Sequence, residues 1–297
     1  MRLVTYESAG STRLGAVAEG KVVDLSSPLQ GFADRAVSRG GAMIDFLSAG
    51  APAMDAVREH LAEAQRNWRA QAHPALEQVR LLAPIPRPGK IVAIGRNYAD
   101  HAAETGVQPF ENPRIIAKLP SSVCGPGAAV RRPEGIAKLD YEVELGVVIG
   151  ARARMVPRAA ALQAVAGYTV LNDMSAREFQ FDVAPAQTTF AKSMDDFCPM
   201  GPWIVTADEI PDPQTLSLRL WVNDDLRQDG NTHDMLFGVA QLIAYISRFM
   251  TLEPGDVIAT GTPAGIGAFR TPPVWLQPGD QLRLEVERIG VLEHSVA

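Results

Sequence analysis

The sequence predicts an α+β protein rich in β-strand, in which a mixed β-roll or barrel follows a small N-terminal α/β domain. Short β-branched runs separated by glycine and proline fill most of the chain beyond residue 115. Helical periodicity is concentrated in one N-terminal stretch and one later stretch. Strands and helices therefore do not alternate regularly, which argues against a doubly wound sheet.

The N-terminal part combines strands with helices. Residues 2–7 alternate between polar and apolar, and residues 13–25 form a longer strand run with a hairpin-type interruption. Helical patterns follow at 43–47 and 52–70, the second with apolar residues at helical spacing. This mixture predicts a small α/β unit.

A proline-rich segment marks the end of that unit. Three prolines occupy alternate positions within residues 75–88, where a helix cannot continue. We therefore expect a small domain at 1–80 and a larger one at 85–297.

The larger domain begins with a short buried strand at 90–95, after which Asn97 can cap a helix that ends before Gly106. One long amphipathic helix is expected at 235–250. The remaining expected strands lie at 141–149, 167–171, 203–206, 216–222, 256–260 and 281–288.

Composition excludes several classes of function. The net charge is −6 and the positive residues are scattered, so the chain lacks the electrostatic footprint of a nucleic-acid-binding protein. The N-terminus lacks the apolar run of a signal peptide, and no apolar run is long enough for a membrane span. Cys124 and Cys198 form neither a CxxC pair nor a Cys/His cluster. We expect a cytoplasmic protein without a nucleic-acid or membrane partner.

Two carboxylates alternate in the segment DYEVELGVVI. Side chains at positions i and i+2 of a strand share a face, about 7 Å apart. Glu142 and Glu144 therefore lie side by side at the mouth of an apolar strand. A divalent cation between them would remove the cost of burying two unpaired anions. A solvated strand edge explains the same pattern, and this alternative stays open on the spacing alone.

A third carboxylate, Asp173, ends the strand run at 167–171. Ser175 and Glu178 fit an S-x-x-E capping box, which predicts a helix that begins shortly after Asp173. An ordinary turn aspartate is the alternative. Three carboxylates without a nearby cysteine or histidine select a hard cation, so Mg²⁺ or Mn²⁺ is expected ahead of Ca²⁺.

Further candidates occur in three short segments. His101 and Glu104 are three residues apart on a predicted helix, where a carboxylate can orient an imidazole for general-base catalysis. Lys192 and Thr262 stand among small residues. A surface pair, a solvated lysine and a simple turn are the alternatives for these residues.

A series of ordered segments over residues 84–297 resembles the fumarylacetoacetate hydrolase family. The segments are GRNYADHAAETG, KLPSSVCGPG, DYEVELGVVIG, GYTVLNDMSAREFQ, AKSMDDFCPMGPWIVTADEI, LEPGDVIATGTPAGIG and LQPGDQLRLEVERIG. The resemblance implies a mixed β-roll domain of that family's type and a homodimer. Residues 188–191 and 222–225 depart from the family's pattern, which bears on side-chain specificity.

The resemblance also implies a role for each candidate residue. Its metal ligands fall on Glu142, Glu144 and Asp173, its catalytic residues on His101, Glu104 and Lys192, and its substrate contacts on Arg177, Gln180 and Thr262.

The activity expected from this set is metal-dependent hydrolysis of a C–C bond in a small 2,4-dioxo acid, such as an acylpyruvate or fumarylpyruvate, through an enolate. Decarboxylation of oxaloacetate and keto–enol isomerisation of a dienoate would use the same residues and stay open. A metal-containing binding protein without turnover is the third alternative.

Overall fold

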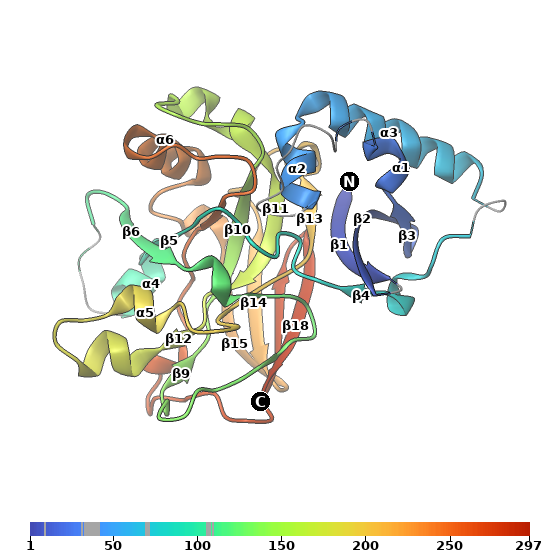
Figure 1. The fold of residues 1–297 in the computed structure, drawn as a ribbon. Coiled ribbons are helices and arrows are strands. Elements are labelled where there is room, and N and C mark those ends of the chain that lie inside the picture. The colour runs from blue at the N-terminus through green and yellow to red at the C-terminus, as the bar shows by residue number, and fades with distance from the viewer. Residues whose placement is uncertain (9, 31, 33–41, 69–71, 105–107, 109) are drawn as a thin grey trace.

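A computed structural model describes the chain apart from residues 9, 31, 33–41, 69–71, 105–107 and 109, and apart from the side chains of 102–104. Two large β-sheets, a two-stranded ribbon and several helices make up the described part of the chain, which confirms the predicted α+β, β-rich fold class (Figure 1). Within the described ranges, no helix has both the length and the apolar character needed to cross a membrane.

The larger sheet carries strands from both halves of the chain. They are β1 (Arg2–Ser8), β2 (Ser11–Ala18), β3 (Lys21–Asp24), β4 (Arg80–Leu81), β5 (Ile91–Gly95), β6 (Arg114–Lys118), β7 (Val123–Cys124), β10 (Val143–Ile149), β11 (Val165–Asn172), β13 (Cys198–Thr206) and β16 (Val257–Ala259). The main order is β3-β2-β1-β13-β11-β10-β16-β5-β6, with β4 on β1 and β7 on β13. The strands β10 and β11 are central in this sheet, and nearly all their residues are buried. Glu142 directly precedes β10, Glu144 lies in it, and Asp173 directly follows β11.

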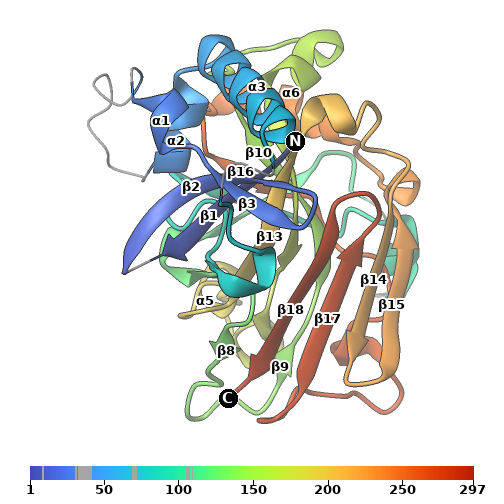
Figure 2. The same cartoon turned by 90° about the vertical axis from the view of Figure 1, so that its right-hand side faces the viewer.

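A second sheet packs against the first (Figure 2). It has the order β15-β14-β17-β18-β8, and a separate two-stranded ribbon pairs β9 with β12. The inner faces share one apolar core, to which Leu145 and Val147 of β10 contribute along with Leu218 and Leu284 of the second sheet. The bounds are β8 (Ala129–Val130), β9 (Leu139–Asp140), β12 (Ser175–Ala176), β14 (Ser217–Val222), β15 (Asp225–Asn231), β17 (Gln281–Val286) and β18 (Gly290–Val296).

Helices cover the ends and one face of the large sheet (Figures 1 and 2). The helix α3 follows the expected amphipathic pattern, begins with a proline in its first turn, and buries Ala53, Val57 and Ala64. The α-helices are α1 (Ser26–Leu29), α2 (Ala42–Ser48), α3 (Ala51–Arg66), α4 (Ala99–Glu104), α5 (Thr188–Ala191) and α6 (Val239–Phe249). Short 3₁₀ segments lie at 76–78, 120–122, 158–164, 207–209, 232–234 and 267–269, and a π-helical turn at 178–182.

Two local predictions were wrong for one reason. Asn97 does not cap α4: its side-chain amide donates to the carbonyls of Phe237 and Thr260 at 3.0 and 2.7 Å, and its Oδ1 accepts from the Phe237 amide at 2.9 Å. The same bonds fix the chain at Phe237, and the residues before Gly238 form a 3₁₀ turn and a bend instead of an α-helix. The predicted helix at 235–250 therefore starts only at Val239, as α6.

The N-terminal strands continue the large sheet, because β1 pairs antiparallel with β13 through Arg2↔Val205 and Leu3↔Ile204. A second apolar core joins Leu3 and Val57 of the N-terminal part to Leu171. The proposed division into 1–80 and 85–297 stays a prediction. In either case the N-terminal part supports the sheet that carries the candidate site.

Candidate active site

Three carboxylates converge where two neighbouring strands are interrupted. The register Val143↔Asn172 between β10 and β11 places Glu142 beside Asp173, and the Asp173 amide donates to the Glu142 carbonyl at 2.9 Å. Glu144 lies two positions further along β10, on the same face. One ligand oxygen from each of the three lies within 4.8 Å of the others, and all three residues are buried.

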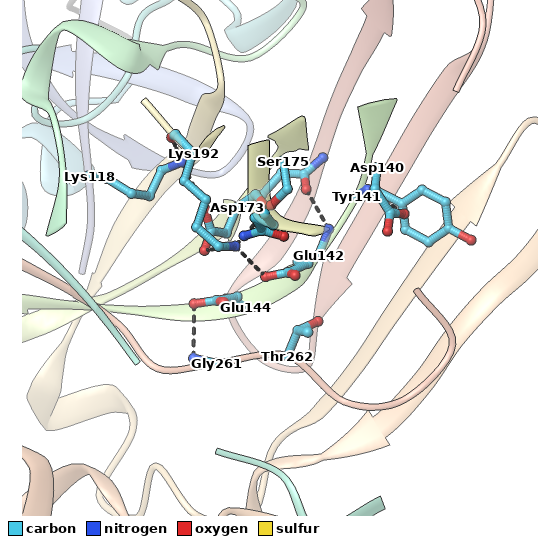
Figure 3. Close-up of polar contacts among 12 residues, drawn as sticks. Lys118, Asp140, Tyr141, Glu142, Glu144, Asp173, Ser175, Lys192, Gly261 and Thr262 are labelled. Carbon is cyan, nitrogen blue, oxygen red and sulfur yellow. Dashed lines mark hydrogen bonds and ion pairs between the residues drawn. The ribbon is translucent and has the colours of Figure 1, made fainter. Parts of the chain in front are cut away.

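Two lysines supply positive charge to this cluster (Figure 3). The Lys192 ammonium donates to Glu142 at 2.9 Å, to Asp173 at 2.6 Å and to the Ser175 hydroxyl at 2.9 Å. The Lys118 ammonium lies 2.8 Å from Asp173 Oδ1 and donates to the carbonyl oxygens of residues 192 and 197. Both lysines are buried, so these contacts hold charge in a setting that water does not screen.

Arg177 is fully engaged by its surroundings. Its Nε donates to Asp140 at 2.9 Å, its Nη2 to Glu142 at 2.6 Å and its Nη1 to Gln180 Oε1 at 2.7 Å. The two residues expected to contact substrate, Arg177 and Gln180, thus bind each other. Both line the cavity described below.

The carboxylates differ in their protonation. Burial alone would raise the pKa of Glu142, but Lys192, Arg177 and His101 outweigh it and hold that pKa at about 2. Burial, followed by the charges of Asp173 and Glu142, raises the pKa of Glu144 well above its ordinary value. Among the described residues, Glu144 has no ion pair and accepts only from the Gly261 amide, at 2.9 Å (Figure 3).

This arrangement fits a divalent cation. Three buried carboxylate oxygens form the hard donor set that Mg²⁺ and Mn²⁺ prefer. Glu144 is a buried acid that an added cation would allow to ionise. We therefore treat Glu142, Glu144 and Asp173 as the candidate metal ligands.

The predicted capping box at Ser175 and Glu178 was wrong. Ser175 lies in β12, and its hydroxyl donates to the Asp173 carbonyl at 3.1 Å and accepts from Lys192. Glu178 instead accepts from the amides of Ala137 and Lys138, at 2.6 Å each. The segment directly after Asp173 is held in the β9–β12 ribbon, so the helical turn that follows begins only at Glu178, as a π-helical turn without that capping box.

A cavity of about 260 Å³ opens over the cluster. Its wall contains two of the candidate metal ligands, Glu142 and Asp173, but not Glu144. It also contains the other predicted site residues with described side chains, which are His101, Arg177, Gln180, Lys192 and Thr262. The Thr262 hydroxyl accepts from Gln228 and donates to the Val143 carbonyl, each at 2.8 Å. The side chain of Glu104 lies outside the described residues, so its pairing with His101 stays a prediction.

Sequence reasoning gave no role to Lys118 or Asp140, and it gave Ser175 only the role of a helix cap. Lys118 lies in the quoted segment KLPSSVCGPG, and Asp140 lies two residues before Glu142, on the alternation that pairs Glu142 with Glu144. Acidic residues thus occupy three alternate positions, 140, 142 and 144, and this pattern could have indicated that Asp140 also faces the site, where it accepts from Arg177. The sequence carries no comparable signal for the burial of Lys118.

Comparison with known proteins agrees with this geometry. Residues 90–297 match the family model described as the C-terminal domain of fumarylacetoacetate hydrolase. The chain is 39% identical to the mitochondrial oxaloacetate tautomerase of Xenopus laevis, over 100% of this chain and 90% of that one.

Solved structures agree as well. Maleylpyruvate hydrolase from Sphingobium sp. SYK-6, in complex with manganese(II) ion and pyruvate, matches with a TM-score of 0.80 and 34% identity, over 100% of this chain and 99% of that one. Fumarylacetoacetate hydrolase from Exiguobacterium antarcticum matches with a TM-score of 0.83 and 35% identity over the same shares. A β-rich fold of packed sheets with a buried acidic cluster thus defines the class. The chain belongs to the fumarylacetoacetate hydrolase family of enzymes.

Proposed function

We propose that this protein is a divalent-metal-dependent hydrolase that cleaves a C–C bond in a small 2,4-dioxo acid of the acylpyruvate type. The observation that carries the proposal is the convergence of three buried carboxylates on a cavity that also contains His101 and Lys192. The similarity to a maleylpyruvate hydrolase that binds manganese and pyruvate supports it.

Glu142, Glu144 and Asp173 would hold the Mg²⁺ or Mn²⁺ ion. When bound, such a cation polarises substrate oxygens and stabilises the negative charge of an enolate. Lys118 supports the site by holding Asp173 through a buried ion pair of 2.8 Å. Arg177 holds Glu142 in the same way, at 2.6 Å.

His101 would act as the general base. It is buried in the cavity wall, and Glu104 on the same helix would orient its ring. His101 takes a proton from water, and the water oxygen attacks the distal carbonyl carbon. The bond between that carbon and the central carbon breaks, its electrons form the enolate, and a proton returned to the central carbon completes the 2-oxo acid product.

Lys192 would stabilise the enolate oxygen as its charge develops. Its ammonium donates to the carboxylates of Glu142 and Asp173 and also to the uncharged hydroxyl of Ser175, which is not a candidate metal ligand. Asp173 and Glu142 outweigh the effect of burial and raise the pKa of Lys192, so it carries a full charge at neutral pH. Thr262 and the Arg177–Gln180 pair would position the substrate.

Keto–enol isomerisation is the second candidate reaction. It needs the same enolate stabilisation and no water, and the 39% identity to an oxaloacetate tautomerase favours it specifically. Decarboxylation of oxaloacetate is related through the same enolate. A binding protein without turnover would lack a general base or a side chain that stabilises the enolate. Here His101 and Lys192, the candidates for these two roles, both line the cavity.

A turnover panel tests the proposal. Acetylpyruvate, fumarylpyruvate and oxaloacetate are incubated with the enzyme and Mg²⁺ or Mn²⁺, with and without chelator, and products are identified by mass. Metal-dependent release of pyruvate and a carboxylic acid supports the hydrolase. Tautomer exchange or CO₂ release without cleavage would refute it in favour of the alternatives. Glu142→Gln should abolish metal-dependent turnover, while Glu253→Gln, a change in an exposed surface pair, should not.

A further inference from the structure

A turn at residues 264–269 forms part of the cavity wall and contacts the helix that carries the candidate general base. Phe269 of this turn lines the cavity. The Ala264 amide donates to Asp100 Oδ2 in α4 at 3.2 Å. The rings of Phe269 and His101 lie 6.2 Å apart between centroids. The 264–269 turn therefore supports α4 at two points, one of which is His101 itself.

The other side of the turn is bound by one buried carboxylate, that of Asp140. The amides of Gly267 and Ala268 donate to its Oδ1 and Oδ2 at 2.7 and 3.0 Å. Arg177 Nε donates to Oδ2 at 2.9 Å, and the Tyr141 amide donates to Oδ1, also at 2.9 Å. Each carboxylate oxygen thus accepts from two N–H groups, and the side chain has no exposed surface.

The chemistry of both partners in this contact is restricted. All four donors are N–H groups, so a carboxylate can accept from each of them, whereas an amide would turn its own NH₂ group toward two of them. A Cβ at Gly267 would lie 2.7 Å from Asp140 Oδ1 and 2.0 Å from the Val274 carbonyl oxygen. Only glycine can bring its amide this close to the acid.

Asp140 also has a distinct place among the acceptors of the substrate-binding arginine. The Arg177 guanidinium donates at 2.6 to 2.9 Å to three side chains, which are Asp140, Glu142 and Gln180. Glu142 and Gln180 line the cavity, where a cation and a substrate would compete for them, but Asp140 does not. Asp140 therefore keeps its hold on Arg177 Nε whatever the cavity contains.

We propose that Asp140 is a positioning residue for two groups of the site. It fixes the candidate base His101 through the 264–269 turn, and it fixes Arg177 through the direct ion pair. The inference rests on the proposed function for the roles of these two residues. Because charge-assisted hydrogen bonds are stronger than neutral ones, removing the charge of Asp140 should release both groups.

Asp140→Asn tests the proposal, because it keeps the shape of the side chain and removes its charge. Asp256→Asn is the matched control. Asp256 is also buried, at 1% exposure, and forms an ion pair with Lys90. Its carbonyl accepts from the Ile149 amide, at the end of β10 that is far from Glu142.

The position of His101 is measured by its carbethoxylation with diethyl pyrocarbonate in Mg²⁺ buffer, followed by peptide mass spectrometry. His101 is 6% exposed and should react slowly in the wild type. We expect Asp140→Asn to raise its rate at least about fivefold, the increase in local opening that the loss of one buried hydrogen bond predicts. The exposed His233 and the buried His294 are internal references and should keep their rates. Asp256→Asn should leave all three rates unchanged.

The position of Arg177 is measured by calorimetric titration of pyruvate, the 2-oxo acid product of the proposed reaction, in the same buffer. Asp140→Asn should weaken pyruvate binding at least about tenfold, because the guanidinium loses a charged partner, and Asp256→Asn should change it by less than about twofold. Absence of pyruvate binding by the wild type would overturn the assignment of Arg177. An unchanged His101 rate, unchanged pyruvate binding, or an equal rise at His294 in Asp140→Asn would overturn the proposal.

Ala268→Pro is a second variant, which keeps the proposal testable if Asp140→Asn does not fold. It deletes one N–H donor to Asp140 at a 3₁₀ position that the φ of proline fits, and it leaves the Asp140–Arg177 pair in place. It should raise the His101 rate and change pyruvate binding by less than about twofold, since only the turn loses a bond. An unchanged His101 rate would disprove the link through the turn.

These outcomes separate the positioning role from the proposed function. A raised His101 rate and weakened pyruvate binding in Asp140→Asn, with a wild type that cleaves no dioxo acid, would retain the positioning role and reject the hydrolase. Cleavage of acetylpyruvate by Asp140→Asn with the kcat and KM of the wild type would retain the hydrolase and reject the positioning role. Neither the carbethoxylation nor the titration depends on turnover.

Discussion

A buried histidine behind the candidate site makes stability depend on pH. His294 lies in β18 and is 3% exposed, with Nε2 2.9 Å from the Asn172 side-chain nitrogen. Burial lowers the pKa of His294 to about 4, from an ordinary 6.5. Below pH 6.5 the unfolded chain therefore binds a proton that the native protein accepts only near pH 4. The full difference of 2.5 pH units at about 1.4 kcal/mol each is about 3.5 kcal/mol, and the free energy of unfolding has fallen by about 3 kcal/mol at pH 4, where the native His294 is half protonated.

His294→Gln provides the comparison. The glutamine amide can accept from Asn172 as the neutral imidazole does, but it does not titrate. Urea unfolding of both proteins is measured from pH 4 to 7.5; because the carboxylates titrate in both, the difference isolates His294. We expect the wild type to lose about 3 kcal/mol relative to the variant between pH 7.5 and 4. A constant difference, or a pKa of His294 near 6.5 by NMR, would refute the reasoning.

Three further predictions concern single residues. Glu144→Gln removes a buried acid that no ion pair compensates, so the metal-free protein should melt higher at pH 8 while Mn²⁺ affinity, measured by titration, falls at least about tenfold; unchanged Mn²⁺ affinity would exclude Glu144 as a ligand. Lys118→Met should cost about 1–3 kcal/mol in urea unfolding, because it removes one of the two buried ammonium groups that pair with Asp173 and leaves only Lys192, and an unchanged stability would contradict the ion pair. Gly265→Ala should lower stability by about 2–4 kcal/mol, since its Cβ would collide with the Arg227 carbonyl oxygen; Gly279→Ala, also at positive φ but in open space, should cost only about 1–2 kcal/mol, and equal losses would disprove the collision.

The parts of the fold that follow from local pattern could be predicted. The α3 helix has an amphipathic periodicity, and the strands β10 and β11 are largely apolar runs that match their burial on both faces, so these sequences carry the signal. The start of α6 and the role of Asn97 could not be predicted in this way. Both depend on hydrogen bonds between residues 140 positions apart, and no local pattern encodes such a contact.

The candidate site was predictable to a similar extent. The spacing of Glu142 and Glu144 indicates a shared strand face, and the family resemblance adds Asp173. Lys118 gave no signal, because the side chains beside it in β6 are largely exposed and its burial comes from contacts with residues 173, 192 and 197.

The position of the acidic cluster follows from a break in one antiparallel pair. β10 and β11 pair as far as Val143↔Asn172, and the same two chain segments pair again as β9 and β12 through Ser175↔Asp140. The two residues of each segment between these pairs include Glu142 and Asp173. Regular pairing is interrupted there, apart from the hydrogen bond from the Asp173 amide to the Glu142 carbonyl, while the flanking pairs fix the backbone on both sides and the two carboxylates line the cavity. The β9–β12 ribbon beyond the break also supplies two partners of the site's cations. The Ser175 hydroxyl accepts from the Lys192 ammonium, and the Asp140 carboxylate accepts from Arg177 Nε, at 2.9 Å each. One interrupted hairpin thus positions both the candidate ligands and the charges that balance them, which explains why the site is formed without a long loop.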